Sequence, residues 1–480
     1  MNFPFVFKVL GKLLYIEALA LCIPLCVSIY YKQDDVTAFL QTIFICVLVG
    51  AGSSFIQPKS NKIKIKEGLA IVTLGWLIFS IYGSLPFLLS GTIPNFADAL
   101  FETISGFTTT GASILTEIEG LPMGILFWRS FTHWIGGMGI LVFTIAILPK
   151  MGAGSFQIIK AESPGPVSEK VVPRVKDTAI VLYGIYIGVT ILEFVLLLLG
   201  GMTVYDAAVH TFGTVGTGGF STKNNSVGYY SPYIQWVITI FMFASGVNFA
   251  LYYLIFQGKV KKMLADEECR FYASIVLVAT LIIALDLHLY HVYDGGFFEV
   301  LRHSAFQVVA IVTTTGYSTA DFDVWPSVSQ SILLMLFFVG GCAGSTGGSI
   351  KVIRILVATK SLKNSVQKVL HPHAVLPVKI NGKTVGNDTL SLILNFIILW
   401  AFIMFFSTVI VSIDDFPLID SFSAVAATFG NVGPGFGSVG PTCNFSHFSD
   451  GIKYFLCFLM LLGRLEMYTV IALFAPRFWK

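Results

Sequence analysis

The sequence predicts an all-α polytopic membrane protein with four parallel helix–pore-loop–helix repeats in a pseudo-fourfold arrangement, preceded by two N-terminal helices. The chain of 480 residues is 55% hydrophobic and only 12% charged, whereas a soluble domain has about 25% charged residues. Apolar segments of bilayer length recur along it. Four of the loops between these segments repeat one pattern, which indicates internal repetition.

Ten apolar segments, of about 17–25 residues each, should cross the membrane. They lie near 13–31, 38–57, 68–90, 124–148, 178–201, 233–256, 272–292, 328–356, 390–412 and 452–475. Lys8 and Lys12 precede the first segment as in a signal peptide, but no small-residue cleavage site follows before Lys32, so we expect a retained helix. The even number of spans places both termini on the same side.

The basic residues indicate which side that is. If the N-terminus is cytoplasmic, most of the 30 Lys and Arg residues fall in cytoplasmic segments. The exceptions are Lys32, Arg129, Lys223, Arg302, Lys453 and Arg464. The positive-inside rule therefore predicts that both termini are cytoplasmic.

The repeated loops align on one glycine. In each, a moderately apolar stretch too short to span leads into a turn rich in Thr and Gly. The glycines are Gly111, Gly219, Gly316 and Gly433, about 100 residues apart. Thirteen residues before them stand Asp98, Asp206 and Asp420, with His303 in the third copy. Each copy begins and ends inside, so the copies are parallel and surround a central pore.

These observations divide the chain into six parts. The two N-terminal helices occupy 1–60, and the repeats occupy 67–150, 177–262, 270–357 (with a broken second helix) and 390–480. Between the last two repeats, 358–389 forms a cytoplasmic segment. Its sequence VKINGKTV places Asn-Gly between alternating apolar residues, which predicts a β-hairpin.

The turns suit a cation pore. A dehydrating cation exchanges water for protein oxygens, which rings of backbone carbonyls supply. Glycine permits the φ values that aim carbonyls at an axis, and the turns read TTTG (108–111), GTGG (216–219), TTTG (313–316) and GNVG (430–433). Ordinary turns are the simpler interpretation of one loop, but four loops in register favour a pore. The three aspartates could cap the short helices and make the outer mouth negative.

The third repeat contains GGCAGSTGG, with five glycines in nine residues. A continuous helix does not tolerate this easily, because each glycine costs up to about 1 kcal/mol relative to alanine. We therefore expect a broken helix and an intramembrane loop that crosses the pore beneath the turns. The expected gate residues are Gly340, Gly341, Gly344, Ser345, Thr346, Gly347, Gly348 and Arg464.

Arg464 lies inside the last apolar segment, where a charge costs roughly 2.5–3.5 kcal/mol unless it meets water or a partner. It either forms a buried salt bridge with Glu466 or another acid, or projects into the pore and repels cations. Arg129 and His133 should belong to a structural polar network. The basic residues around Lys351, Arg354 and 360–383 either dock a partner or only determine topology.

The motifs WRSFTHWIGGMGI (128–140), TVGTGGFST (214–222), GGCAGSTGGSIK (340–351), GNVGPG (430–435) and GRLEMYT (463–469) resemble those of the Trk/Ktr/HKT superfamily of K⁺ transporters. The resemblance covers nearly the whole chain, and the two extra N-terminal helices resemble the Trk branch. It implies a selectivity filter made by the four aligned glycines and their neighbours. These residues are Thr109, Thr110, Gly111, Thr217, Gly218, Gly219, Thr314, Thr315, Gly316, Asn431, Val432 and Gly433.

The resemblance also implies K⁺ as the transported ion, a homodimer in the lipid of a bacterial cytoplasmic membrane, and a cytoplasmic, nucleotide-binding, ring-forming regulatory subunit. Gly111 favours K⁺, because members with serine there favour Na⁺. His303 departs from the aspartate of the other copies. The chain has no GxxxxGK[ST], so any nucleotide must bind the partner.

A Na⁺- or H⁺-coupled secondary transporter is the alternative, although such folds often use inverted repeats. We expect no enzymatic activity, covalently bound cofactor or nucleic-acid partner.

Overall fold

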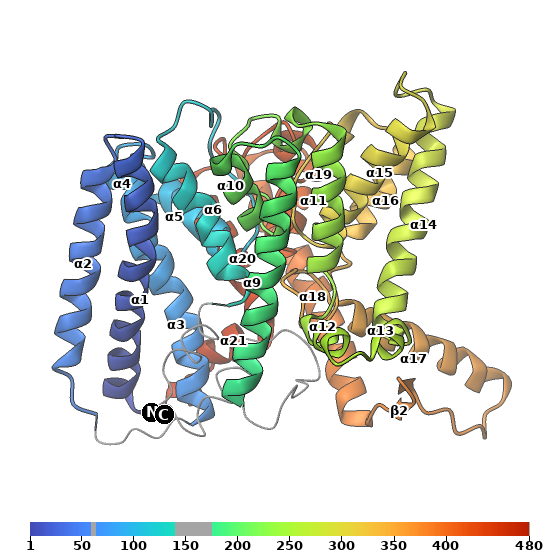
Figure 1. The fold of residues 1–480 in the computed structure, drawn as a ribbon. Helices are drawn as coiled ribbons and strands as arrows, with labels where there is room; N and C mark the ends of the chain where they lie inside the picture. Colours follow the sequence, from blue (N-terminus) through green and yellow to red (C-terminus); the bar gives the residue numbers. More distant parts are fainter. Residues whose placement is uncertain (59–63, 140–174, 480) are drawn as a thin grey trace.

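The computed structural model describes residues 1–58, 64–139 and 175–479, and Figure 1 shows their arrangement. Among these residues, six helices are long and apolar enough to cross a membrane, or eight if each of two bent pairs counts as one span. The predicted fold class, an all-helical membrane protein, is therefore confirmed. The predicted span 124–148 is described only to residue 139, and its remainder lies outside the described residues.

Helix α1 (Phe3–Tyr30) and helix α2 (Val36–Ser54) form an N-terminal pair that packs against α3 and lies at one side of the molecule (Figure 1). Small residues let the two helices approach closely. A Cβ added to Gly11 would lie 1.7 Å from Oγ of Ser53, and one added to Gly50 would lie 3.0 Å from the carbonyl oxygen of Gly11.

The remaining described residues form four copies of one unit: a long helix, a short pore helix and a second helix. The first copy has α3 (Ile65–Gly83), α4 (Leu85–Leu89), α5 (Phe96–Phe107) and α6 (Met123–Gly137). The second has α9 (Val175–Leu199), α10 (Val204–Val215), α11 (Pro232–Ser245) and α12 (Phe249–Phe256), followed by α13 (Val260–Leu264). The third has α14 (Glu267–Leu289), α15 (Phe297–Val312), α16 (Ser327–Leu336) and α17 (Val352–Leu370). The fourth has α18 (Asn387–Val411), α19 (Leu418–Phe429), α20 (Asp450–Arg464), α21 (Met467–Ile471) and α22 (Pro476–Trp479).

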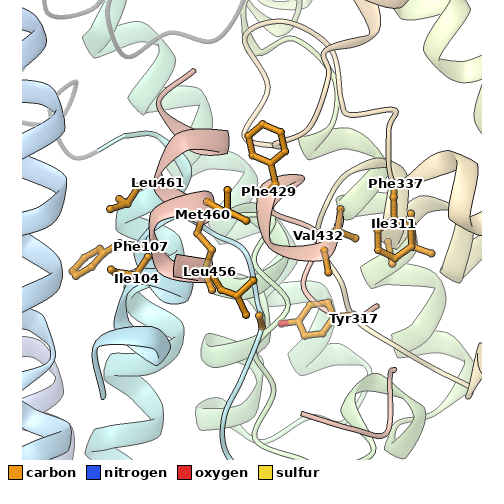
Figure 2. Packing of buried hydrophobic residues seen from close by; sticks show 14 of the residues in the cluster. Ile104, Phe107, Ile311, Tyr317, Phe337, Phe429, Val432, Leu456, Met460 and Leu461 are labelled. Carbon is orange, nitrogen blue, oxygen red and sulfur yellow. The ribbon is translucent and has the colours of Figure 1, made fainter. Parts of the chain in front are cut away.

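The second helices hold neighbouring copies together. Helix α6 packs on the pore helix α10 of the next copy, α11 packs on α15, and α20 packs on α5 of the first copy. This last contact closes the four copies into a ring. Figure 2 shows part of the core there, with Ile104 and Phe107 of α5 beside Leu456 and Met460 of α20.

The second helices are broken more often than the sequence predicts. The sequence predicts a break only in the third copy, where the chain leaves α16 at Leu336 and re-enters a helix at Val352. The second and fourth copies also bend, by 96° and 117°. Asn248 starts a new helix by accepting a hydrogen bond from the N–H of Ala250 (2.9 Å), and Glu466 has a left-handed φ of 60°. Local capping and strain, not glycine density, break these two helices.

The two chain ends lie together at one end of the molecule (Figure 1). The ring of Phe3 stacks on that of Trp479 at 6.0 Å, and Nζ of Lys66 donates to the carbonyl oxygen of Arg477 (2.9 Å). The termini therefore share one side, as an even number of spans requires.

The same end carries the two-stranded hairpin of β1 (Lys379–Ile380) and β2 (Lys383–Thr384). Asn381 and Gly382 form its turn with φ values of 48° and 77°, the conformation for which Asn-Gly is suited. Val378 beside the hairpin packs with Val357 of α17 and Ile393 of α18.

Gly11→Ala should destabilise the N-terminal helix pair, because its Cβ overlaps both side-chain atoms of Ser53. Overpacking of this kind costs about 1–3 kcal/mol. Gly52→Ala on α2 is the control, since its Cβ meets nothing within 4 Å. Thermal unfolding in detergent should show a lower midpoint for Gly11→Ala only, and equal midpoints would contradict the close packing.

Candidate functional site

The four pore helices end in one repeated backbone motif. The first residue after each helix cap is left-handed: Thr109, Thr217, Thr314 and Asn431 have φ values of 55°, 56°, 59° and 53°. The N–H of the following residue bonds back to the carbonyl five residues earlier. These bonds join Thr110 to Ser105 (2.9 Å), Gly218 to Gly213 (2.7 Å), Thr315 to Ala310 (2.8 Å) and Val432 to Ala427 (2.8 Å). This is the Schellman arrangement, which normally uses glycine.

Threonine is an unusual choice at these positions. A β-branched residue with positive φ is a steric outlier, and the left-handed conformation costs roughly 1–2 kcal/mol for any residue with a Cβ. The cost recurs at Thr109, Thr217 and Thr314. Strain that the surrounding structure maintains is typical of functional sites.

The aligned glycines adopt positive φ as well. Gly111, Gly219, Gly316 and Gly433 have φ values of 78°, 83°, 75° and 104°. The residue before each glycine is absent from the positive-φ positions, so φ alternates in sign through each turn. Such alternation lets successive carbonyls face one side of the chain, whereas those of a β-strand alternate between sides.

The four turns touch one another in a closed ring. A Cβ added to each glycine would strike the carbonyl oxygen of the middle residue in the next turn. These contacts are Gly111 with Gly218 (2.0 Å), Gly219 with Thr315 (2.0 Å), Gly316 with Val432 (2.2 Å) and Gly433 with Thr110 (2.6 Å). The order is first, second, third, fourth and first again. We call the twelve residues 109–111, 217–219, 314–316 and 431–433 the turn ring.

A cavity of about 520 Å³ opens onto the turn ring, and all four glycines line it. Arg129, Lys223 and Asp321 contribute ionisable groups to its wall. The three aspartates expected at the outer mouth are absent from this wall. Asp98 pairs with Nζ of Lys453 (2.5 Å), while Asp420 accepts a hydrogen bond from the N–H of Ser438 (3.0 Å).

The expected capping role of these aspartates is also corrected. Asp98, Asp206 and Asp420 occupy the third position of their helices, and the side-chain caps of α5 and α10 are Asn95 and Thr203. The aspartates remain in the first turn, at the positive end of the helix dipole.

His303 takes over a contact that an aspartate makes elsewhere. Asp206 accepts from Oγ1 of Thr222 (2.7 Å), and Nδ1 of His303 lies 2.9 Å from Oγ1 of Thr319. Both threonines stand three residues beyond their aligned glycines. Histidine in place of aspartate in the third copy therefore preserves the contact with the threonine that follows the aligned glycine.

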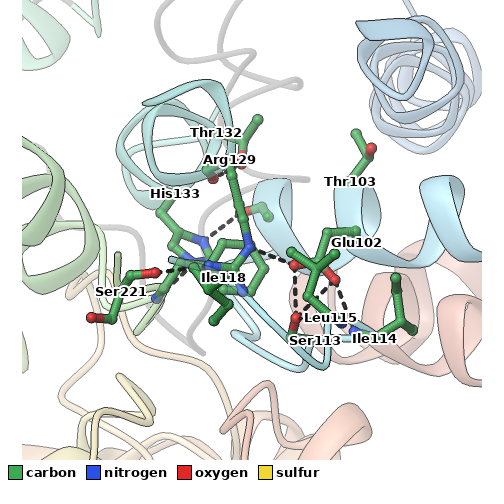
Figure 3. A network of polar contacts seen from close by, with 12 residues as sticks. Glu102, Thr103, Ser113, Ile114, Leu115, Ile118, Arg129, Thr132, His133 and Ser221 are labelled. Atoms are coloured by element: carbon green, nitrogen blue, oxygen red, sulfur yellow. Dashed lines mark hydrogen bonds and ion pairs between the residues drawn. The ribbon is translucent and has the colours of Figure 1, made fainter. Parts of the chain in front are cut away.

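A buried polar network supports the first two turns, as expected for Arg129 and His133 (Figure 3). Nε of Arg129 pairs with Glu102 at 2.5 Å, and Nη1 of Arg129 donates to the carbonyl oxygen of Ser221 (3.2 Å). Glu102 also accepts from the N–H of Ile114 (2.9 Å). His133 joins the same copies, through the carbonyl of Gly106 (2.8 Å) and the N–H of Phe220 (3.3 Å).

Glu102 and its counterparts are functional residues that are not among those predicted from the sequence. Counting nine residues back from the aligned glycines gives Glu102, His210 and Gln307, with Ser423 adjacent to the fourth position. Each side chain binds the segment that leaves its own turn. His210 contacts Oγ of Ser221 (2.9 Å), and Gln307 donates to the carbonyl of Ala320 (3.4 Å). Polar residues at the same distance before each aligned glycine were the sequence signal that could have identified this supporting set.

The glycine-rich segment 340–351, here called the gate loop, lies against the other side of the turn ring. The N–H of Gly348 donates to Oγ1 of Thr314 (2.6 Å). A Cβ on Gly347 would lie 2.8 Å from the carbonyl oxygen of Thr313, and one on Gly348 equally close to that of Gly430. No larger residue would let the loop lie so near the ends of two pore helices.

Arg464 connects three copies beneath the ring. Its guanidinium donates to the carbonyl oxygens of Thr346 in the gate loop (2.6 Å), Gly136 (2.6 Å) and Gly137 (3.0 Å). Glu466, one suggested partner of Arg464, pairs with Arg354 at 2.6 Å. The geometry thus places Arg464 against the gate loop.

Docking and topology were the two alternatives for the basic segment that starts here, but Lys351 and Arg354 themselves are buried, at 1% and 5% exposure, and offer no surface to a partner. Nζ of Lys351 donates to the carbonyl of Gly347 and to Oγ of Ser345 (3.4 Å). Lys351 is therefore an internal support of the gate loop. Its place directly after the glycine-rich motif was the signal that could have identified it.

Glu102→Ala should destabilise the protein strongly, because it leaves Arg129 buried without its carboxylate. Breaking a buried pair costs about 3–5 kcal/mol. The control is Glu119→Ala, whose partly exposed pair with Lys223 spans 3.6 Å and should contribute about 0–1 kcal/mol. Unfolding midpoints measured in detergent test this, and similar losses in the two variants would contradict the assigned importance of the network.

Comparisons with known proteins agree with this geometry. The TrkH family model, described as a cation transport protein, matches residues 36–480. The chain is 37% identical to the Trk system potassium uptake protein TrkH of Salmonella typhimurium, with 100% of both chains covered. It is 34% identical to the Trk system potassium uptake protein TrkG of Escherichia coli, covering 98% of this chain and 97% of the relative.

A crystal structure of the potassium transporter TrkH from Vibrio parahaemolyticus superposes with a TM-score of 0.90 at 35% identity, over 100% of both chains. The matched family model, the full-length relatives and the shared fold lead to one conclusion. This chain belongs to the TrkH family of cation transport proteins.

Proposed function

We propose that this protein takes up K⁺ across the cytoplasmic membrane through a pore whose selectivity filter is the turn ring. The closed ring of four equivalent turns is the observation that carries the proposal. The names of the full-length relatives, which are potassium uptake proteins, support K⁺ as the ion. Parallel copies around one ring argue against the inverted repeats common in coupled transporters.

The proposed ligands are backbone carbonyls of the turn ring. Thr110, Gly218, Thr315 and Val432 hold equivalent positions, since each carbonyl oxygen meets the glycine of an adjacent turn. Four oxygens at one level can replace part of the hydration shell of K⁺. Thr109, Thr217, Thr314 and Asn431 supply the next level in this proposal.

The gate loop and Arg464 would control passage beneath the filter. A guanidinium next to the path repels a cation, and its bond to Thr346 fixes the loop in place. Opening then requires the loop to leave Arg464.

Control by a cytoplasmic nucleotide-binding ring subunit and assembly as a homodimer are further parts of the proposal. With Lys351 and Arg354 buried, the docking surface reduces to the exposed part of α17 and the hairpin. Their exposed basic residues are Lys363, Lys368, Lys379 and Lys383. In this orientation both termini face the cytoplasm.

Gly316→Ser should lower the ratio of K⁺ to Na⁺ flux in liposomes. The added Cβ would lie 2.2 Å from the carbonyl oxygen of Val432, and serine is strained at a φ of 75°. A drop of about tenfold, or ~1.4 kcal/mol of discrimination, is the expected size. Gly120→Ser in an open outer loop is the control, because its Cβ meets nothing within 4 Å. An unchanged ratio in Gly316→Ser would refute the filter assignment.

Arg464→Ala should raise K⁺ flux several-fold in the absence of any partner, because it removes both the positive charge and the tie to Thr346. Rubidium uptake into liposomes measures this. Arg477→Ala, on an exposed side chain near the C-terminus, should leave uptake unchanged. Equal uptake by the wild type and Arg464→Ala would exclude Arg464 from the gate.

A further inference from the structure

A single carboxylate holds both ends of the gate loop. Oε1 of Glu268, in the first turn of α14, accepts hydrogen bonds from the N–H groups of Ala343 (2.7 Å) and Ile353 (3.1 Å). Ala343 precedes the loop's central glycines, and Ile353 follows the loop in the first turn of α17. The Glu268 side chain is buried, with 7% of the residue exposed. One oxygen atom therefore connects the segment that enters the loop with the segment that leaves it.

The carboxylate of Glu268 also accepts a hydrogen bond from the N-terminal turn of α17. Lys351, the N-cap of α17, provides no side-chain cap, so the first N–H groups of this helix need another acceptor. Glu268 supplies one from a different helix, at the positive end of the α17 dipole. Loss of Glu268 would release the start of α17 together with the loop.

The start of α14 is in turn fixed by the cytoplasmic hairpin. Oδ1 of Asn381, at the hairpin tip, accepts from the N–H of Glu267 (2.9 Å), and its Nδ2 donates to Asp266 (2.7 Å). Asp266 is the N-cap of α14 and accepts from the N–H of Cys269 (2.8 Å). A continuous set of contacts thus runs from the hairpin tip to the residue that holds the gate loop.

A second contact ties the hairpin to the same place. Lys360 of α17 pairs with Glu267, and its Nζ also donates to the carbonyl oxygen of Lys379 in β1 (2.8 Å). Helix α17, the hairpin and the first turn of α14 therefore meet at Glu267. Displacement of the exposed hairpin would act on two elements that flank the gate loop.

We propose that Glu268 is a latch that keeps the gate loop closed, and that the hairpin at 379–384 is the cytoplasmic lever that releases it. The proposal rests on the function proposed above and assigns the place at which a regulatory partner acts. A partner that moves the hairpin pulls Asn381 from Asp266 and Glu267. The first turn of α14 then shifts, and Glu268 loses one or both N–H groups of the loop.

Cys342 is a natural reporter of loop opening, because it lies in the loop and is 1% exposed. The test uses the full-length protein in liposomes without a partner. The other cysteines, Cys22, Cys26, Cys46, Cys269, Cys443 and Cys457, are replaced by Ser or Ala. A charged, water-soluble thiol reagent then measures the rate at which Cys342 reacts, and Rb⁺ and Na⁺ uptake are measured on the same samples.

Glu268→Ala should increase the labelling rate of Cys342 and the uptake of Rb⁺ by about tenfold. The reason is that the N–H groups of Ala343 and Ile353 both lose their acceptor. The preference for Rb⁺ over Na⁺ should not change. Glu268→Gln keeps an oxygen acceptor in place and should remain near the parent rate. Asn381→Gly removes only the side-chain contacts of the hairpin tip, because glycine accepts the left-handed φ of 48° at this position. It should increase Cys342 labelling and Rb⁺ uptake by less than Glu268→Ala does.

Asn364→Ala is the matched control: this asparagine of α17 donates to the carbonyl of Leu376 (3.0 Å), which lies outside α14. Unchanged Cys342 labelling in both Glu268→Ala and Asn381→Gly would overturn the latch, whatever the flux. An equal increase in Asn364→Ala and Asn381→Gly would overturn the lever, since general loosening would explain it. If labelling responds as expected but no variant conducts, the latch stands and the proposed K⁺ pathway fails.

Discussion

The close approach of four glycines to four carbonyl groups is the constraint on which this structure depends. At each aligned glycine, a single added carbon would lie 2.0–2.6 Å from an oxygen of the next turn. Because the contacts close on themselves, no turn can move without displacing its neighbours. The strained threonines and Asn431 before the glycines belong to the same constraint, since they bring each pore helix to its end with the next carbonyls facing the ring.

The surrounding protein maintains that ring by polar contacts that differ in chemistry but recur in position. A carboxylate, an imidazole, an amide and a hydroxyl, from Glu102, His210, Gln307 and Ser423, each bind the chain after their own turn. Such buried groups are costly unless they are paired. Their pairing explains how unlike sequences hold four similar turns. On the opposite side, Arg464 and Glu268 hold the gate loop by hydrogen bonds to its backbone, and Lys351 supports it from within. The position of the loop therefore depends on a few polar contacts that a small displacement can break.

The sequence predicted the parts of the molecule that repeat. Hydrophobic length located the helices, and the aligned glycines located the ring, because both are properties of residue type and spacing. It did not predict the bends after Ser245 and Arg464, which depend on one cap at Asn248 and one left-handed residue, Glu466. Contacts between distant segments were also missed. Nothing in the order of residues shows that Glu268 meets Ala343 and Ile353, or that Lys453 neutralises Asp98.

Anomalous diffraction from crystals soaked in Rb⁺ or Tl⁺ would test the central claim most directly. The account predicts anomalous density inside the turn ring, between the carbonyl groups of Thr110, Gly218, Thr315 and Val432, and this density should persist when Na⁺ is added in excess over Rb⁺ or Tl⁺. Ion density confined to other parts of the protein, with an empty ring at saturating Rb⁺, would contradict it.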